Sequence, residues 1–183
     1  MNESYKETIQ ALFRWREHFL KRIPSLDEVR AAKIPHGRLV GIGIREFTSG
    51  MMIGSETFEE CMLVPEEDGA VLTIGSKSLG KPVVTRRCRC GSRELEALQA
   101  LSEEENLIGW SFLKRDMARE TFVPDRSESS TLTLIYETGS APGGKTLERS
   151  VDMKAAEQQG GTEVLLRLRA LLKEAEETGE ALP

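Results

Sequence analysis

Residues 130–151 read STLTLIYETGSAPGGKTLERSV, and this stretch decides what kind of sheet the chain can form. In its first half, Leu132, Leu134 and Tyr136 alternate with two threonines and an isoleucine. Such alternation is typical of a half-exposed antiparallel strand, whereas a parallel strand buried on both faces would be almost continuously apolar. A second run, LERSV, follows the glycine-rich middle. The stretch therefore predicts two strands joined by a hairpin loop.

The middle of the same stretch, residues 139–146, reads GSAPGGKT and matches the phosphate-loop pattern G-x-x-x-x-G-K-[ST]. In that interpretation the backbone from Gly139 to Gly144 would cradle phosphates, Lys145 would reach the terminal ones and Thr146 would hold magnesium. A phosphate loop also needs a buried parallel strand before it, a helix after it and a strand that ends in aspartate. The sequence after Thr146 supplies no such strand. A nucleotide-binding enzyme is therefore kept as the alternative function, which titration with ATP or GTP and magnesium would test.

The N-terminal residues carry a helical pattern. Apolar residues recur every three or four positions from Tyr5 and Ile9 onward, with charged residues between them, as an amphipathic helix requires. Pro24 ends this helix, and Ser25 is placed to cap a short second one. We expect residues 1–36 to form a helical arm, which either lies over the sheet that follows or binds a partner.

Residues 37–183 predict an α+β domain. Four runs with the strand period, at 39–47, 51–64, 70–76 and 82–90, are separated by glycine, proline, serine or acidic turn residues. The short links between them imply an antiparallel meander. Two further helical patterns, one before and one after the hairpin stretch, would cover the sheet. We therefore expect an α+β fold in which an antiparallel sheet, made of the four-strand meander and the C-terminal hairpin, is covered by helices.

The overall composition narrows the classes of partner. The chain has 25 Lys and Arg against 30 Asp and Glu, so its net charge is -5. An acidic chain lacks the excess of basic residues with which proteins bind the phosphates of nucleic acids, so we expect no nucleic-acid partner. No apolar run approaches the ~20 residues that cross a bilayer, and we expect no membrane partner. Three cysteines are too few for a disulfide framework, so a reducing cytoplasm is the expected location.

The three cysteines are weak candidates for a metal site. Cys88 and Cys90, at i and i+2, would project from one face of a strand, and Cys61 could join them if its strand lies alongside. The spacing differs from the repeated C-x-x-C of zinc sites, and free cysteine is commonly a small core residue. We therefore expect core or edge thiols, with no metal and no other cofactor.

A local positive surface is expected in the last strands of the meander. Between Gly69 and Arg93 the sequence has no acidic residue, in contrast to the glutamate-rich helices on either side. This surface would either pair with acids of the neighbouring helices or bind an anionic partner. Its basic residues are Lys77, Lys81, Arg86, Arg87, Arg89 and Arg93.

Several segments carry a resemblance that spans roughly residues 44–175. SGMMIGSETFEECMLVPEEDGAVLTI, SRELEALQALSEEENLIGW and STLTLIYETGS, followed by an amphipathic helix, are similar to a loosely defined family of uncharacterised bacterial proteins. The most recognisable points are Gly50, Gly54, Trp110 and Gly139. The chain departs from the pattern by an APGG insertion in the hairpin loop and by DRSESS in place of an acidic-glycine turn. No activity is assigned to the family, so the resemblance implies no function.

These patterns favour a non-enzymatic protein-interaction or structural module. His18 lies within the first helix and His36 between a proline and a glycine, and neither is accompanied by a nucleophile in a sharp turn. The amphipathic N-terminal helix is the expected contact with a protein partner or with a second copy of the chain. Removal of residues 1–36 would then abolish that contact.

Overall fold

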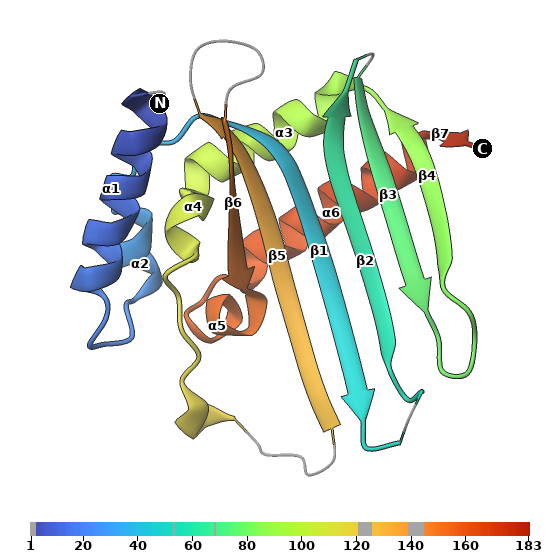
Figure 1. Cartoon of the computed structure of the whole chain (residues 1–183), viewed down its shortest axis with the longest axis horizontal. Helices are drawn as coiled ribbons and strands as arrows, with labels where there is room; N and C mark the ends of the chain where they lie inside the picture. Colours follow the sequence, from blue (N-terminus) through green and yellow to red (C-terminus); the bar gives the residue numbers. More distant parts are fainter. Residues whose placement is uncertain (1–2, 53, 68, 121–125, 139–144) are drawn as a thin grey trace.

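A seven-stranded antiparallel sheet carries the fold (Figure 1). The computed structural model describes residues 3–52, 54–67, 69–120, 126–138 and 145–183, within which the strands lie in the order β6-β5-β1-β2-β3-β4-β7. Their bounds are β1 (Arg38–Gly50), β2 (Thr57–Glu66), β3 (Gly69–Lys77), β4 (Val84–Cys90), β5 (Arg126–Thr138), β6 (Lys145–Asp152) and β7 (Glu180–Leu182).

The predicted α+β fold is confirmed, and with it the four-strand meander and the C-terminal hairpin. Strands β1 to β4 each pair with the next, because short turns bring successive strands back antiparallel. Strand β5 pairs with β1, and β6 continues outward from β5, so the hairpin extends the free edge of the meander. The short strand β7, which the sequence did not predict, pairs with β4 at the opposite edge.

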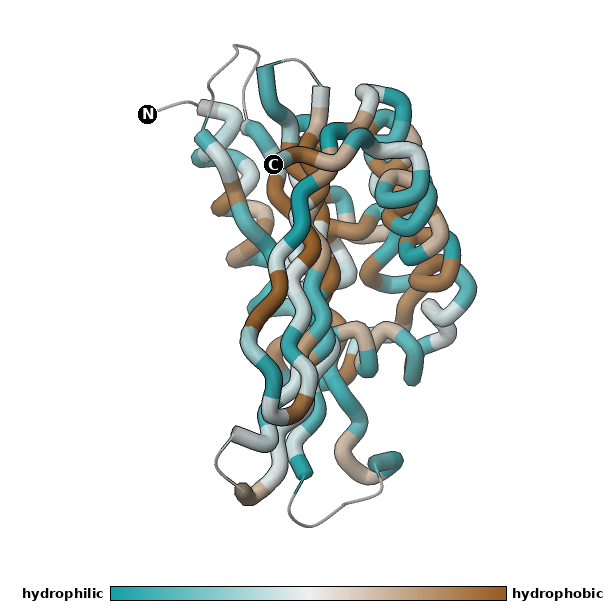
Figure 2. The backbone as a smooth tube through the Cα atoms, turned by 90° about the vertical axis from the view of Figure 1, so that its right-hand side faces the viewer, coloured by the Kyte–Doolittle hydropathy of each residue, from teal (hydrophilic) through white to brown (hydrophobic). Residues whose placement is uncertain are grey.

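Helices cover one face of the sheet and flank its β6 edge. In Figure 1, α3 and α6 run behind the strands, while α1, α2 and α4 lie beside β6; Figure 2 shows the helical layer next to the layer of strands. None of the described helices is long and apolar enough to span a membrane. The helices are α1 (Glu3–His18), α2 (Leu26–Arg30), α3 (Ser92–Glu105), α4 (Leu107–Trp110), α5 (Met153–Gln158) and α6 (Thr162–Thr178), with a 3-10 turn at Met117–Arg119.

The alternation that predicts the hairpin also builds the core. Leu132, Leu134 and Tyr136 are buried, while the intervening residues of β5 are partly exposed. Ile42 of β1 stands opposite both Leu63 of β2 and Leu134, so these side chains form one apolar layer beneath the helices. Burying one such side chain contributes about 1.5–3 kcal/mol. This layer therefore holds the helices against the sheet.

The N-terminal residues pack into the same core as the sheet. Leu26 and Val29 of α2 belong to the continuous apolar cluster that includes the strands. Ser25 caps α2 as predicted, because its Oγ accepts from Glu28 N at 3.3 Å while the Glu28 carboxylate accepts from Ser25 N at 2.9 Å. The N-terminal helices and the sheet therefore share one hydrophobic core, and the domain boundary expected after residue 36 stays a prediction.

Asn106 joins this N-terminal segment to the helices that cover the sheet. At the junction of α3 and α4 it has a left-handed φ of 49°, a conformation that asparagine tolerates better than most residues. Its Nδ2 donates to the carbonyl oxygens of Val29 (3.1 Å), Arg30 (2.8 Å) and Ala32 (2.8 Å). The carbonyls of Val29 and Ala32 also accept from the backbone N–H groups of Ala32 and Ile34, so Asn106 adds a side-chain donor from another part of the chain at the end of α2.

Tyr136 makes stability depend on pH in the alkaline range. Its buried hydroxyl shares a hydrogen bond of 2.8 Å with Ser102 Oγ. Burial raises the pKa of Tyr136 to about 12, against about 10 in an unfolded chain. Because the unfolded chain releases this proton first, we expect the free energy of unfolding to lose about 2–3 kcal/mol as pH rises from about 10 to about 12.

The variant Tyr136→Phe isolates this contribution. It has no phenol to ionise at position 136, so its free energy of unfolding should fall less steeply over the same pH interval. Urea unfolding of both proteins at a series of alkaline pH values measures the two slopes. Parallel slopes would contradict the assignment to Tyr136, because the other groups that titrate there are common to both proteins.

Candidate functional site

The last two residues of the GSAPGGKT motif begin a strand. Lys145 opens β6, and Thr146 stands opposite Glu137 of β5 in the antiparallel register. Thr138 Oγ1 donates to the carbonyl oxygen of Lys145 at 2.8 Å, which ties the two strands together where the hairpin loop leaves them. The two strands predicted from the sequence are thus both present.

The surroundings of Lys145 differ from those of a phosphate-loop lysine. In a phosphate loop the Lys-[ST] pair begins a helix whose free N–H groups face the phosphates. Here the same pair begins an antiparallel strand. The exposed Lys145 ammonium lies 5.2 Å from the centre of the Tyr5 ring of α1, in a cation–π contact. Gly139 and Gly144 lie outside the described residues, and nucleotide binding stays a prediction.

The basic residues predicted to form one positive surface are divided between two faces. Arg86 and Arg87 are neighbours on β4, so their side chains project from opposite sides of the sheet. Three of the six basic residues form ion pairs: Lys77 with Glu56 at 3.3 Å, Arg86 with Glu176 at 2.8 Å and Arg87 with Glu66 at 2.8 Å. Three are exposed and form no ion pair with a described carboxylate: Lys81, Arg89 and Arg93. Binding of an anionic partner by this set stays a prediction.

The cysteines are held apart by the strand between them. Cys61 lies in β2 and Cys88 and Cys90 lie in β4, with β3 between these two strands. Ile74 of β3 stands opposite Cys61, and Leu72 of β3 stands opposite Cys88. Within the described ranges, no three Cys, His, Asp or Glu residues are grouped as a metal ion would need. The three cysteines are free: Cys90 is buried in the core, Cys61 packs against it and Cys88 is partly exposed.

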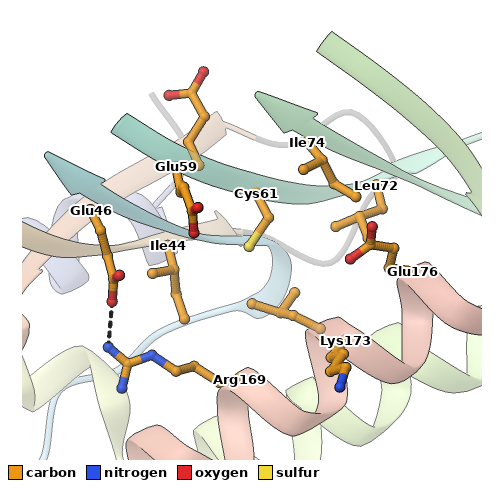
Figure 3. Close-up of a pocket in the computed structure, with 11 residues that line it drawn as sticks. Ile44, Glu46, Glu59, Cys61, Leu72, Ile74, Arg169, Lys173 and Glu176 are labelled. Carbon is orange, nitrogen blue, oxygen red and sulfur yellow. Dashed lines mark hydrogen bonds and ion pairs between the residues drawn. The ribbon is translucent and has the colours of Figure 1, made fainter. Parts of the chain in front are cut away.

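A pocket of 280 Å³ lies between α6 and strands β1 to β3 (Figure 3). Its floor is apolar and includes Ile44, Leu72 and the thiol of Cys61. Its rim is charged, and Arg169 of α6 donates to a carboxylate oxygen of Glu46 at 2.6 Å. Burial raises the pKa of the Cys61 thiol, so this group is protonated and weakly nucleophilic at neutral pH. The pocket can hold an apolar group, but its thiol is not activated.

A second candidate site is the exposed side of the N-terminal segment. Phe13, Leu20 and Ile23 are large and apolar, yet they are 59%, 61% and 43% exposed. These three residues are named the N-terminal surface. Leu12 and Phe19 of the same segment are buried in the core. The segment is thus apolar on two sides, and only one of them is covered by the described part of this chain.

Polar contacts hold the N-terminal surface in place. Lys114 Nζ donates to the carbonyl oxygens of Phe19 at 2.7 Å and Leu20 at 3.3 Å, which fixes the turn after α1. Arg22 pairs with Glu28 of α2 at 2.6 Å and ties the same turn to the next helix. The apolar side chains are therefore presented from a backbone that is anchored on both sides.

A smaller pocket, of 160 Å³, opens beside Phe13 between α1, β6 and the segment after α4. It is named the arginine pocket, because two arginines supply its charged groups. Arg16 projects from the exposed side of α1, and Arg149 lies on the helix-facing side of β6. The lining residues are Ile9, Leu12, Phe13, Arg16, Phe112 and Arg149.

Arg149 is half-buried, and only some of the N–H donors of its guanidinium form hydrogen bonds within the described residues. Its Nε and Nη2 donate to Ser111 Oγ at 3.2 and 2.9 Å, and its Cζ lies 5.9 Å from the centre of the Phe112 ring. Burial and, to a smaller extent, the nearby charge of Arg16 lower the pKa of Arg149. Neither arginine forms an ion pair with a carboxylate of the described residues. The pocket therefore gathers two cations without a counter-charge from this part of the chain.

The sequence contains one signal for this pocket, in the run LERSV of β6. Leu147, Arg149 and Val151 occupy alternate positions of LERSV, so a strand places all three on one face. The two outer residues are buried, which puts a charged residue at an inward position. Arg16, by contrast, looks like every other charged residue of an amphipathic helix. Its proximity to Arg149 depends on the packing of α1 against β6.

Comparison with known proteins found no matching protein family, no matching curated protein and no matching solved structure.

Proposed function

We propose that this chain is a non-enzymatic protein-binding module and that its partner docks on the N-terminal surface. The observation that carries the proposal is the exposure of Phe13, Leu20 and Ile23 on a segment whose other side is anchored in the core. Each large apolar side chain contributes about 1.5–3 kcal/mol when it moves from water into apolar contact. A partner that covers all three side chains would bury an apolar cluster, and such clusters near the centre of an interface supply most of its binding energy.

The rigidity of this surface supports a role in binding. Phe13 and Leu20 are seven residues apart, and the hydrogen bonds from Phe19 N to Trp15 O and from Leu20 N to Glu17 O continue a turn beyond the end of α1. A spacing of seven residues is close to two helical turns, which favours one side of the segment for both side chains. Because Lys114 fixes the turn, a partner need not order this backbone when it binds.

Charge and thiol chemistry indicate the kind of partner and the compartment. A net charge of -5 supports a protein partner over a nucleic acid. Cys61, Cys88 and Cys90 are free thiols, which suits the reducing cytoplasm. The proposed partner is therefore a cytoplasmic protein, which includes a second copy of this chain.

Substitution of surface residues tests this proposal better than truncation. Deletion of residues 1–36 would remove Leu26, Val29 and Ile34, which are buried in the common core. Loss of these side chains would expose the apolar side chains that they cover. Lost binding could then not be told apart from lost folding, whereas Phe13 can be changed without opening the core.

We expect p-benzoyl-phenylalanine in place of Phe13 to cross-link one protein when it is illuminated in cells that make this chain. Leu166 on α6, which is 57% exposed, is the matched control position. The same photoreactive group at Leu166 should not capture that protein, because Leu166 lies outside the N-terminal surface. Mass spectrometry identifies the product, and sedimentation velocity of the purified chain shows whether the partner is a second copy.

The captured protein should bind less tightly once the surface is altered. Phe13→Ser is expected to weaken binding about tenfold or more, as loss of a central apolar contact does. Leu166→Ser should change the affinity less than about twofold. Calorimetry with the purified partner measures both. Equal cross-linking from the two positions, or equal affinities of the two serine variants, would remove the proposal.

A further inference from the structure

The arginine pocket indicates which chemical group is recognised beside the N-terminal surface. We propose that this pocket binds a carboxylate that carries a short apolar group. The inference deepens the proposed function and rests on it only for the source of the ligand. That source is either the C-terminal residue of the partner or a free carboxylic acid.

Two unpaired positive charges give the pocket its preference for an anion. Arg149 donates from Nε and Nη2 to Ser111 Oγ, and its Nη1 has no acceptor among the described residues. Arg16 lies close enough to act electrostatically on Arg149. A half-buried charge without a partner is unfavourable, and an anion between the two arginines would offset that cost through charge-assisted hydrogen bonds.

The apolar walls restrict the kind of anion. Ile9, Leu12 and Phe112 line a space of only 160 Å³. Bringing a doubly charged phosphate against such walls costs more desolvation energy than bringing a singly charged carboxylate. A guanidinium also matches the planar carboxylate with parallel hydrogen bonds. A short apolar group next to the carboxylate would then cover the walls.

A simpler role for Arg149 makes different predictions. An inward-pointing charge on an edge strand such as β6 can prevent pairing with the sheet of another molecule. That role requires neither Arg16 nor an apolar cavity, and it predicts no preference among small ligands. Ligand binding that depends on both arginines separates the two roles.

Titration of the full chain with small acids tests the inference. N-acetyl-leucine supplies a carboxylate with a short apolar group, and N-acetyl-leucinamide supplies the same group without the charge. In nuclear magnetic resonance spectra we expect the acid to shift signals of pocket residues such as Phe112 and Arg149, and the amide to leave them in place. Inorganic phosphate should bind more weakly than the acid. Equal binding of acid and amide would overturn the inference.

Substitutions assign the binding to the two arginines. Arg149→Gln should weaken binding of N-acetyl-leucine about tenfold or more, as loss of a charge-assisted hydrogen bond does. Arg16→Gln changes an exposed side chain, so it tests the same pocket without a threat to folding. Arg14→Gln removes one charge from α1 outside the pocket and should change the affinity less than about twofold. Unchanged affinity in both pocket variants, with unchanged melting temperatures, would overturn the inference.

A short peptide that ends in leucine identifies the source of the carboxylate. If the peptide binds more tightly than N-acetyl-leucine and its C-terminal amide does not bind, the ligand is the end of a protein chain. If N-acetyl-leucine or butyrate binds more tightly, the ligand is a free acid. A partner that is lost with Phe13→Ser but kept with Arg149→Gln would remove the pocket inference and leave the proposed function intact. If N-acetyl-leucine binds but no partner is cross-linked, the proposed function would be removed and the pocket inference would stand.

Discussion

Replacing Asn106 by aspartate is expected to lower the free energy of unfolding by about 3–5 kcal/mol. The two side chains have nearly the same shape, and both tolerate the left-handed φ of 49° at this position. The amide donates to three carbonyl oxygens of the α2 end, whereas a carboxylate would direct negative charge at the same oxygens. The change therefore replaces attraction with repulsion at the joint that holds the N-terminal segment. Urea unfolding of both proteins measures the loss.

Asn106→Gly is the matched control for the backbone. Glycine adopts a positive φ readily, so this variant loses the three hydrogen bonds without adding a charge. Its free energy of unfolding should fall by about 1–3 kcal/mol, which is less than the fall expected for the aspartate variant. Equal losses would show that the charge facing the carbonyls has no effect. A loss near zero for both variants would show that Asn106 does not anchor α2.

Replacing Trp110 by alanine should cost a similar amount, about 3–5 kcal/mol, for a different reason. Trp110 is fully buried, and its Nε1 donates to the carbonyl oxygen of Glu105 at 3.1 Å. A Cβ atom added at Gly161 would lie 2.9 Å from the Trp110 ring, so the indole fills the space up to the backbone before α6. Truncation would leave a cavity that the surrounding helices cannot close.

Trp110→Phe separates lost volume from the lost hydrogen bond. Phenylalanine keeps much of the apolar volume but cannot donate to Glu105, so we expect a loss of about 1–3 kcal/mol. Urea unfolding with an unchanged dependence on denaturant concentration would show that both variants unfold from the same native state. A loss below about 2 kcal/mol for Trp110→Ala would contradict tight packing at this site and indicate that the helices collapse into the space.

The elements that depend on local residue patterns, such as alternating apolar residues and turn residues, could be predicted from the sequence. The hairpin follows from the alternation at Leu132, Leu134 and Tyr136, and the meander follows from turn residues between short runs of strand period. Pairing of β5 with β1 is different, because these strands are distant in sequence and no local pattern specifies the contact. Strand β7 was missed because three residues after Gly179 are too few to show a strand period.

The candidate site depends almost entirely on contacts that are distant in sequence. The amphipathic pattern predicted the first helix, but it could not tell which apolar residues face the core. Leu12 and Phe13 are neighbours, yet Leu12 is buried and Phe13 is exposed. The arginine pocket needs α1 to lie beside β6, and the sequence contains no signal for that packing. In the predicted basic surface, Arg86 and Arg87 project from opposite sides of the sheet, because successive residues of a strand face opposite sides.

The anchor of the N-terminal surface comes late in the chain. Lys114, which holds the turn after α1, lies 95 residues beyond Phe19. At synthesis rates of about 5–20 residues per second, the turn is made roughly 5–20 s before its anchor. During that interval Phe13 and Leu20 are open to water together with the side of the segment that is later buried. A chain still on the ribosome therefore presents a wider apolar surface than the finished protein, and a chaperone would meet that form first.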